Sequence, residues 1–416
     1  MTVRITKPEF NLREKLGELD KPTGLKGNEL MRSDTSQDAR DLISAGRKNM
    51  IINGAMRINQ RNGTSSYTIP HDTNAYGGPD RWAVNEATDG SVSVNMDGDP
   101  AGSNGDGYDV QEFTRAFQIA CSGTATLSSG HNTHFYQNIE GYNITHLGWG
   151  TGSAKPVTLS FWIKTNKAGT YAVGLANNAA DRCCIRDYHQ MGDSKWNKVV
   201  LTFPGCPDGT WLQTNGIGMR VRFCLASGVT YDDGVDGAWV NSNELCTTTS
   251  QVVNFMDSTN NRFFITGVQL EVGENATEFE NRSFGEELEL CQRYFQSNFP
   301  TGVAPQNGYY NANSGLAAGF NGAVCFSSNN LRSPWVMFRP KMNHQPDVTL
   351  YAASNNDDDG KWAAYDHTGG WSSGSSNSID YFGDQGFGVR FGSGGISADI
   401  GEAYLYRGMW VADAEL

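Results

Sequence analysis

Apolar and polar residues alternate along the middle of the chain with the period of a β-strand. Apolar side chains occupy every second position in residues 157–163 and 217–225, with mostly polar residues or glycine between them. A third run, residues 264–272, places Phe264 on the same face as Val268 and ends at Gly273. Strands with one apolar face are typical of antiparallel sheets that pack on one side. We therefore predict an all-β protein built around an antiparallel, jelly-roll-like β-sandwich.

Helical patterns are short and few. Ser283 with Glu286 forms a capping-box pattern before an apolar stripe of Leu288, Cys291 and Phe295, which predicts one helix near residue 290. Two further short amphipathic helices are predicted within residues 1–48. Helices of this length are marginal in water by themselves, so we expect this arm to dock on another chain.

These patterns divide the chain into four segments. They are a helical arm (1–48), the sandwich (49–284), a linker helix (285–300) and a smaller C-terminal β-rich domain (301–416). In the last segment, short strands are predicted around Val348 and Leu350 and over residues 403–410. This segment has too few apolar residues for a monomeric core, so oligomerisation is expected.

Composition and charge argue against several classes of function. Charged residues make up 19% of the chain, which contains 49 glycines, and the net charge is −13. This charge argues against binding to nucleic acid or to an anionic membrane surface. No apolar run approaches the roughly 18 residues of a membrane span, and the N-terminal sequence lacks the apolar core of a secretory signal. Folding in the cytoplasm of the producing cell is expected.

The eight cysteines form no CxxC pair. We expect them to be buried, reduced and packed as small apolar side chains. Within a strand, the adjacent Cys183 and Cys184 would point to opposite faces.

Motifs for catalysis are not found, and we predict that the protein is not an enzyme. A nucleophile elbow, a phosphate-binding loop and a zinc-protease motif are all missing. Carboxylate pairs for glycan cleavage cannot be placed from sequence alone. No cofactor is predicted apart from calcium. An acidic, glycine-rich loop offers the hard oxygen ligands that calcium prefers. The alternative is that this segment is an ordinary polar loop. Its candidate ligands are Asp97, Asp99, Asp106 and Asp109.

Several blocks of sequence resemble bacteriophage tail-fibre and related virion proteins. They include RKNMIING (47–54), TLSFWIKTNKAGTYAVGL (158–175) and ITGVQLEVGENATEFENRSFGEELELCQRYF (265–295). The resemblance implies a homotrimer that carries carbohydrate-binding-like sandwiches. It also implies that residues 1–48 attach the protein to other virion components.

The C-terminal segment contains aromatic residues among Asn, Asp, Ser and Gly. Aromatic faces pack against the C–H patches of sugars while polar groups bind the hydroxyls. The alternative is that these aromatics pack between subunits. The candidate glycan-binding residues are Tyr309, Tyr310, Trp362, Tyr365, His367, Trp371 and Tyr381.

The sequence therefore favours a virion protein, a tail fibre or short fibre, whose distal domain binds a glycan on the bacterial surface. It would assemble in the host cytoplasm and act in the virion. Two alternatives stay open. One is a protein that decorates the capsid or baseplate without binding glycan, and the other is a glycan depolymerase.

Overall fold

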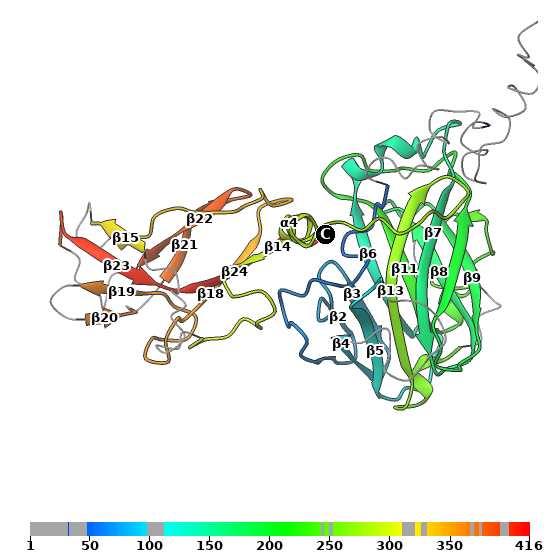
Figure 1. Cartoon of the computed structure of the whole chain (residues 1–416), viewed down its shortest axis with the longest axis horizontal. Helices are drawn as coiled ribbons and strands as arrows, with labels where there is room; N and C mark the ends of the chain where they lie inside the picture. The colour runs from blue at the N-terminus through cyan, green and yellow to red at the C-terminus, as the bar shows by residue number, and fades with distance from the viewer. Residues whose placement is uncertain are drawn as a thin grey trace, which may run out of the picture.

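The computed structural model describes Arg32 and residues 48–97, 112–242, 245–248, 253–309, 321–325, 331–366, 370–373, 377–391 and 399–416. These residues form two lobes joined near helix α4 (Figure 1). The helices predicted within residues 1–48 lie outside the described residues. Within the described part, no helix is both long enough and apolar enough to cross a membrane.

The larger lobe is a sandwich of two antiparallel sheets. In spatial order, the six-stranded sheet contains β1 (Tyr67–Ile69), β4 (Ser91–Asp97), β5 (Ala116–Gly123), β13 (Arg262–Val272), β7 (Val157–Thr165) and β10 (Asn197–Phe203). The seven-stranded sheet contains β12 (Trp239–Val240), β9 (Cys183–Gln190), β8 (Gly169–Ala176), β11 (Ile217–Ser227), β6 (Asn132–Glu140), β3 (Ala83–Ala87) and β2 (Thr73–Ala75). The predicted all-β, jelly-roll-like sandwich is confirmed.

The core between the two sheets is rich in aromatic side chains. Phe135 on β6 and Phe223 on β11 stack with ring centroids 4.7 Å apart, and Trp82 lies 6.0 Å from Phe135. Phe161 on β7 meets Phe223 edge to face from the opposite sheet. The predicted alternation thus holds for β7 and β11, because their apolar faces both point into this core.

The third predicted run is interrupted by a bulge. The pairing of β13 with β7 shifts register between Thr266 and Gln269. Gly267 lies in the bulge at φ +62°, and a Cβ there would lie 2.6 Å from the ring of Phe113. The inserted residue reverses the faces of the strand. Phe263 is therefore buried in the core, and the prediction that Phe264 shares the face of Val268 was wrong.

Short 3-10 helices connect strands of the sandwich. They are η1 (Gly141–Asn143), η2 (Thr145–Leu147), η3 (Val229–Tyr231) and η4 (Phe255–Asp257). All eight cysteines are buried and none of them forms a disulfide among the described residues, which confirms their predicted burial. Cys184 packs in the main core and Cys183 in a cluster on the other face of the sheet, as the strand period predicts.

Helix α4 (Phe284–Gln292) begins at the predicted capping box, in which Ser283 and Glu286 bond each other's backbone. It ends earlier than the expected linker helix of residues 285–300, because β14 (Phe295–Ser297) pairs with β24 (Met409–Asp413). The four-part division of the chain otherwise remains a prediction.

The smaller lobe contains three small antiparallel sheets. One joins β14, β24 and β18 (Asp347–Tyr351). The second contains β15 (Asn321–Val324), β23 (Ala403–Arg407), β19 (Ala363–Asp366) and β20 (Gly370–Ser372). The third contains β16 (Leu331–Arg332), β22 (Gly386–Phe391), β17 (Val336–Met337) and β21 (Asn377–Gly383).

This lobe encloses a core of its own. Trp362, Phe387, Tyr406 and Trp410 are buried together with Phe338. The expectation that the segment has too few apolar residues for a core in one chain was wrong, because its aromatic residues fill the interior in place of aliphatic ones.

Charged side chains and the chain end hold the two lobes together. Glu140 at the end of β6 accepts two hydrogen bonds from Arg293, at 2.9 and 2.6 Å, and one from Tyr294 Oη at 2.8 Å. Arg81 pairs with Glu415, and Asn138 Nδ2 donates to the Leu416 carbonyl at 2.6 Å. The last residues of the chain therefore lie against the sandwich.

Candidate functional site

The aromatic residues singled out in the smaller lobe do not form one surface. Trp362 is 3% exposed; its Nε1 donates to the Met409 carbonyl at 2.9 Å, and its ring stacks on Tyr406. Its predicted role as a sugar-stacking residue is not supported, because both ring faces lie in the core. Tyr309 packs edge to face against Phe299. Tyr310 and His367 lie outside the described residues.

Tyr365 and Trp371 come together on the hairpin of β19 and β20. They are direct cross-strand partners, with ring centroids 5.3 Å apart. The guanidinium of Arg407 lies 4.1 Å from the Trp371 ring centroid and is itself held by Asp357 at 2.7 and 2.9 Å. This pair is a small platform, and Tyr365 is its exposed member.

Tyr381 lies apart from this pair, on β21. It is 66% exposed, and Arg332 both covers its ring at 4.8 Å and donates to its hydroxyl at 3.1 Å.

Most of the candidate calcium loop lies outside the described residues. Asp97 is the last residue of β4, and Asp99, Asp106 and Asp109 lie outside the described residues. Among the residues that the structure describes, no cluster of three or more His, Cys, Asp or Glu side chains could hold a metal ion.

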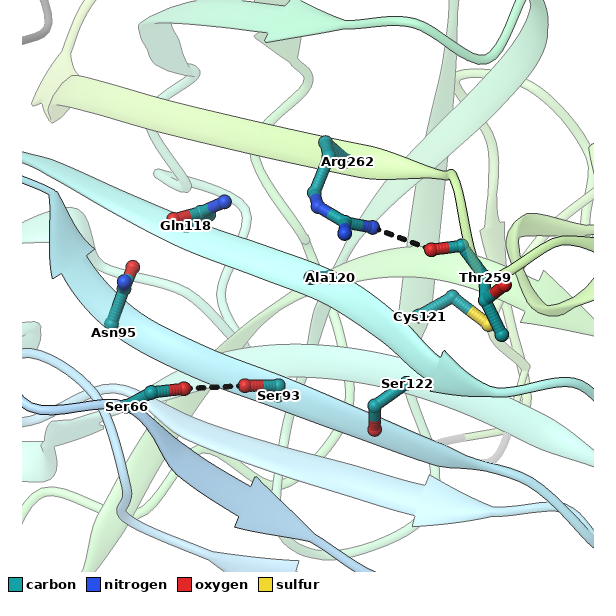
Figure 2. A pocket seen from close by; sticks show the side chains of 9 residues that line it. All are labelled: Ser66, Ser93, Asn95, Gln118, Ala120, Cys121, Ser122, Thr259 and Arg262. Carbon is teal, nitrogen blue, oxygen red and sulfur yellow. Dashed lines mark hydrogen bonds between the residues drawn. The ribbon is translucent and has the colours of Figure 1, made fainter.

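A polar groove crosses the outer face of the six-stranded sheet (Figure 2). Its volume is about 400 Å³. Side chains from β4, β5 and β13 point into it because they alternate with the core residues of the same strands. The lining residues are Ser66, Ser93, Asn95, Gln118, Ala120, Cys121, Ser122, Thr259 and Arg262.

Four side chains lie in register across this face. Asn95 on β4 is the cross-strand partner of Gln118 on β5, and Gln118 is the partner of Phe264 on β13. Lys164 on β7 is opposite Phe264, with its Nζ 5.3 Å from the ring centroid. The row therefore places two amides, a half-buried aromatic ring and an ammonium group side by side at the spacing of adjacent strands.

Not every polar atom that lines the groove is used in a hydrogen bond within the described part of the chain, so a ligand could bond to the remaining ones. Asn95 Oδ1 is buried and has no hydrogen-bond partner within the described part of the chain. Arg262 donates to the carbonyls of Thr259 and Asn261 at 2.7 and 2.9 Å. Cys121 is not a reactive nucleophile, because burial raises the pKa of its thiol to about 11. The hydroxyls, amides and guanidinium of the groove are suited to binding hydroxyl groups.

A second pocket, of about 320 Å³, lies on the outer face of the seven-stranded sheet. It is bounded by strands β3, β6 and β11 and by the segment that follows η3. Its lining residues are Asn85, Asn132, His134, Arg220, Arg222, Tyr231 and Cys246.

Amides and an imidazole form one side of this pocket. Asn132 Oδ1 accepts from Asn85 Nδ2 at 3.0 Å and lies 2.9 Å from His134 Nδ1. Burial lowers the pKa of His134, which favours the neutral ring.

Arg220 and Arg222 form the other side. Arg220 Nε donates to Asn138 Oδ1 at 2.9 Å, and Arg222 Nη1 donates to the Leu245 carbonyl at 3.2 Å. Desolvation, and then the charge of Arg222, lower the pKa of Arg220. The two guanidinium groups therefore repel each other in a partly dehydrated setting.

These two sites were not identified from the sequence. The row of Asn95, Gln118 and Phe264 depends on strand pairing and on the bulge at Gly267, neither of which local patterns reveal. The arginine pair did have a signal: Arg220 and Arg222 alternate with the apolar residues of the clearest strand, so both face away from the core.

Comparisons with known proteins give a likeness of fold only. No family model matches the sequence, and no curated protein matches it. Among solved structures, the enzymatically active domain of tailspike protein 4 from bacteriophage CBA120 matches with 13% identity and a TM-score of 0.26. The match covers 54% of this chain and 21% of that one.

Two carbohydrate-binding modules match in the same way. The family 11 module of Clostridium thermocellum, solved with a β-1,3-1,4-linked tetrasaccharide, has 12% identity and a TM-score of 0.25, over 50% of this chain and 94% of that one. The N-terminal cellulose-binding domain of Cellulomonas fimi β-1,4-glucanase C has 13% identity and a TM-score of 0.24, over 47% and 90%. At these TM-scores the likenesses support no conclusion about what this chain binds.

Proposed function

We propose that this protein is a glycan-binding structural protein of a bacteriophage virion, a tail fibre or short fibre. The observation that carries the glycan-binding part is the row of Asn95, Gln118 and Phe264 across the outer face of the six-stranded sheet. Asn95 and Gln118 line a groove of hydroxyls, amides and one guanidinium (Figure 2), and Phe264 lies next to Gln118 on the neighbouring strand.

This arrangement matches the chemistry of a sugar ring. A sugar offers an apolar C–H face and a rim of hydroxyls that both donate and accept hydrogen bonds. An aromatic ring packs against the face, while amides can donate and accept at the rim. Asn95 Oδ1, which has no hydrogen-bond partner among the described residues, supplies an acceptor whose burial costs free energy until a donor reaches it.

The virion part of the proposal depends on the resemblance to tail-fibre proteins. Residues 1–48 would anchor the protein on the particle, and three copies would associate. Domain 301–416 would supply a second, distal contact through Tyr365 and Trp371. Three weak sites on one fibre bind a cell surface much more tightly than one site, because each binding event raises the effective concentration for the next.

Gln118→Ala tests the groove. Loss of a central amide that bonds sugar hydroxyls should weaken binding to a glycan array by about tenfold per site, without lowering the melting temperature. Lys198→Ala, at an exposed position on β10 in the same sheet, is the matched control and should bind normally. Undiminished binding by Gln118→Ala would remove the groove from the proposal.

The same assay separates the alternatives. A chain that binds no glycan and no cells supports a purely decorating protein, whereas release of soluble sugar supports a depolymerase. For the assembly, the mass measured by light scattering should be three times 45.4 kDa. When the phage encodes only residues 49–416 of this protein, the shortened protein should be absent from the assembled particles. A monomer at micromolar concentration would contradict the trimer.

A further inference from the structure

Two arginines on β11, Arg220 and Arg222, have no carboxylate partner within the described part of the chain, whereas several other arginines of this structure do. Arg81 pairs with Glu415, Arg282 with Glu280 and Glu287, Arg293 with Glu140, and Arg407 with Asp357. Within the described part of the chain, neither Arg220 nor Arg222 has a carboxylate oxygen within 4 Å, and no carboxylate contributes to the lowered pKa of Arg220.

Burying these two arginines without a carboxylate partner costs free energy. Arg222 is 7% exposed, and its Nε is buried without a hydrogen-bond partner among the described residues. Arg220 is two residues away on the same strand face and lines the same pocket. Two like charges so close together, one of them dehydrated, destabilise the empty pocket, and an anion would relieve both the repulsion and the missing hydrogen bond.

Cys246 is the one group in the pocket that offers a negative charge. A hydrogen bond from Cys224 is the main cause that lowers the pKa of its thiol. Its Sγ lies 3.8 Å from Arg222 Nη1 and 3.9 Å from His134 Nδ1. A thiolate would balance at most one of the two guanidinium groups. Arg220, whose only side-chain hydrogen bond within the described part is to the neutral amide of Asn138, would remain without a compensating negative charge.

The rest of the lining is polar but neutral. Asn85 and Asn132 are amides, Tyr231 carries a phenol, and the buried His134 favours its neutral form. An isolated inorganic ion would use the arginines alone. A sugar unit with an acidic substituent would use the arginines for the oxyanion and the amides for its hydroxyls, and the pocket volume of about 320 Å³ has room for one such unit.

We propose that this pocket binds an acidic sugar unit of the glycan, with its carboxylate or phosphate held by Arg220 and Arg222. This inference rests on the proposed glycan binding and adds the class of ligand. Guanidinium groups bind planar or tetrahedral oxyanions through paired, charge-assisted hydrogen bonds. The site would be separate from the groove of Figure 2, which lies on the other sheet.

The test uses the full-length protein with a panel of galacturonic acid, glucuronic acid, sialic acid, galactose 6-phosphate and neutral galactose and glucose. Binding is followed by NMR of the arginine side-chain signals. Acidic sugars should shift the Arg220 and Arg222 signals, whereas the neutral hexoses should not. Comparing the uronic acids with galactose 6-phosphate shows whether the pocket binds a carboxylate or a phosphate. Binding should weaken as ionic strength rises, since part of it is Coulombic.

Arg220→Gln keeps the length and polarity of the side chain and removes its charge. It should weaken binding of the acidic sugars by about tenfold or more, the effect of losing hydrogen bonds to a charged group. Arg182→Gln, which removes an arginine paired with Asp208 elsewhere in the sandwich, is the control and should bind acidic sugars normally. Arg222→Gln is a second variant, checked for folding because Arg222 also bonds the Leu245 carbonyl.

The outcomes separate this inference from the proposed function. If neutral glycans bind and are lost in Gln118→Ala while acidic sugars leave the arginine signals unchanged, the acidic-sugar inference alone is overturned. If no sugar, neutral or acidic, binds anywhere, the proposed function fails as well. Equal losses in Arg220→Gln and Arg182→Gln would show a non-specific charge effect and would also overturn the inference.

Discussion

The sandwich and the smaller lobe place their aromatic side chains differently. In the sandwich, long strands of up to eleven residues hold the core aromatics on one face and leave the other face to carry side chains in register, such as Gln118 beside Phe264. In the smaller lobe, strands of two to seven residues form three small sheets, and two of the tryptophans, Trp362 and Trp410, fill the core.

The difference shows what a wide sheet provides. A continuous sheet fixes the spacing of outer-face side chains from strand to strand, so a row of them can match a ligand. A lobe of short strands must use its aromatic residues to make a core at all. A cluster of aromatic residues in a polar sequence therefore does not by itself indicate a binding surface.

The largest loss of stability should come from Trp362→Ala. Removing a buried indole that also bonds the Met409 carbonyl should cost about 3–5 kcal/mol and unfold the smaller lobe first in a thermal melt. Trp371→Ala, on the hairpin platform, should cost much less. Equal melting temperatures for the two variants would mean that Trp362 is not a core residue.

An intermediate effect is expected for Glu140→Gln at the junction of the lobes. The amide keeps one acceptor but loses the charge that pairs with Arg293, at a cost of about 2 kcal/mol. The two lobes should then melt in separate transitions by calorimetry. A single, undisplaced transition would show that this ion pair does not couple them.

The smallest predicted loss of stability distinguishes the neighbouring residues Phe263 and Phe264. Phe263→Leu changes a core ring and should lower stability by about 1 kcal/mol. Phe264→Leu, on the outer face, should change stability less and instead weaken glycan binding. If Phe264→Leu is the more destabilising of the two, the bulge at Gly267 has been placed incorrectly.

Much of the fold could be predicted because its signals are local. The alternation in β7 and β11, the capping box at Ser283 and the opposite faces of Cys183 and Cys184 each depend on residues a few positions apart. The face of Phe264 could not be predicted, because one inserted residue at Gly267 reverses the alternation and no local rule identifies it.

The candidate sites were harder to predict than the fold. The aromatic residues of the smaller lobe were visible in the sequence, but whether Trp362 is buried depends on packing against Tyr406 and Phe387 from other strands. Conversely, Arg220 and Arg222 were visible as the polar half of a strand. That no carboxylate of the described residues pairs with them depends on which strands lie beside β11.

The sequence by itself determined the all-β class, the main strands, the single capped helix and the burial of the cysteines, because strand period and capping depend on neighbouring residues. Only the tertiary structure decided which outer face carries the row of amides and an aromatic ring and which carries the pair of arginines. Strand order brings together residues more than a hundred positions apart, such as Gln118 and Phe264. Such pairings are selected by the packing of the whole sandwich, which no short stretch of sequence contains.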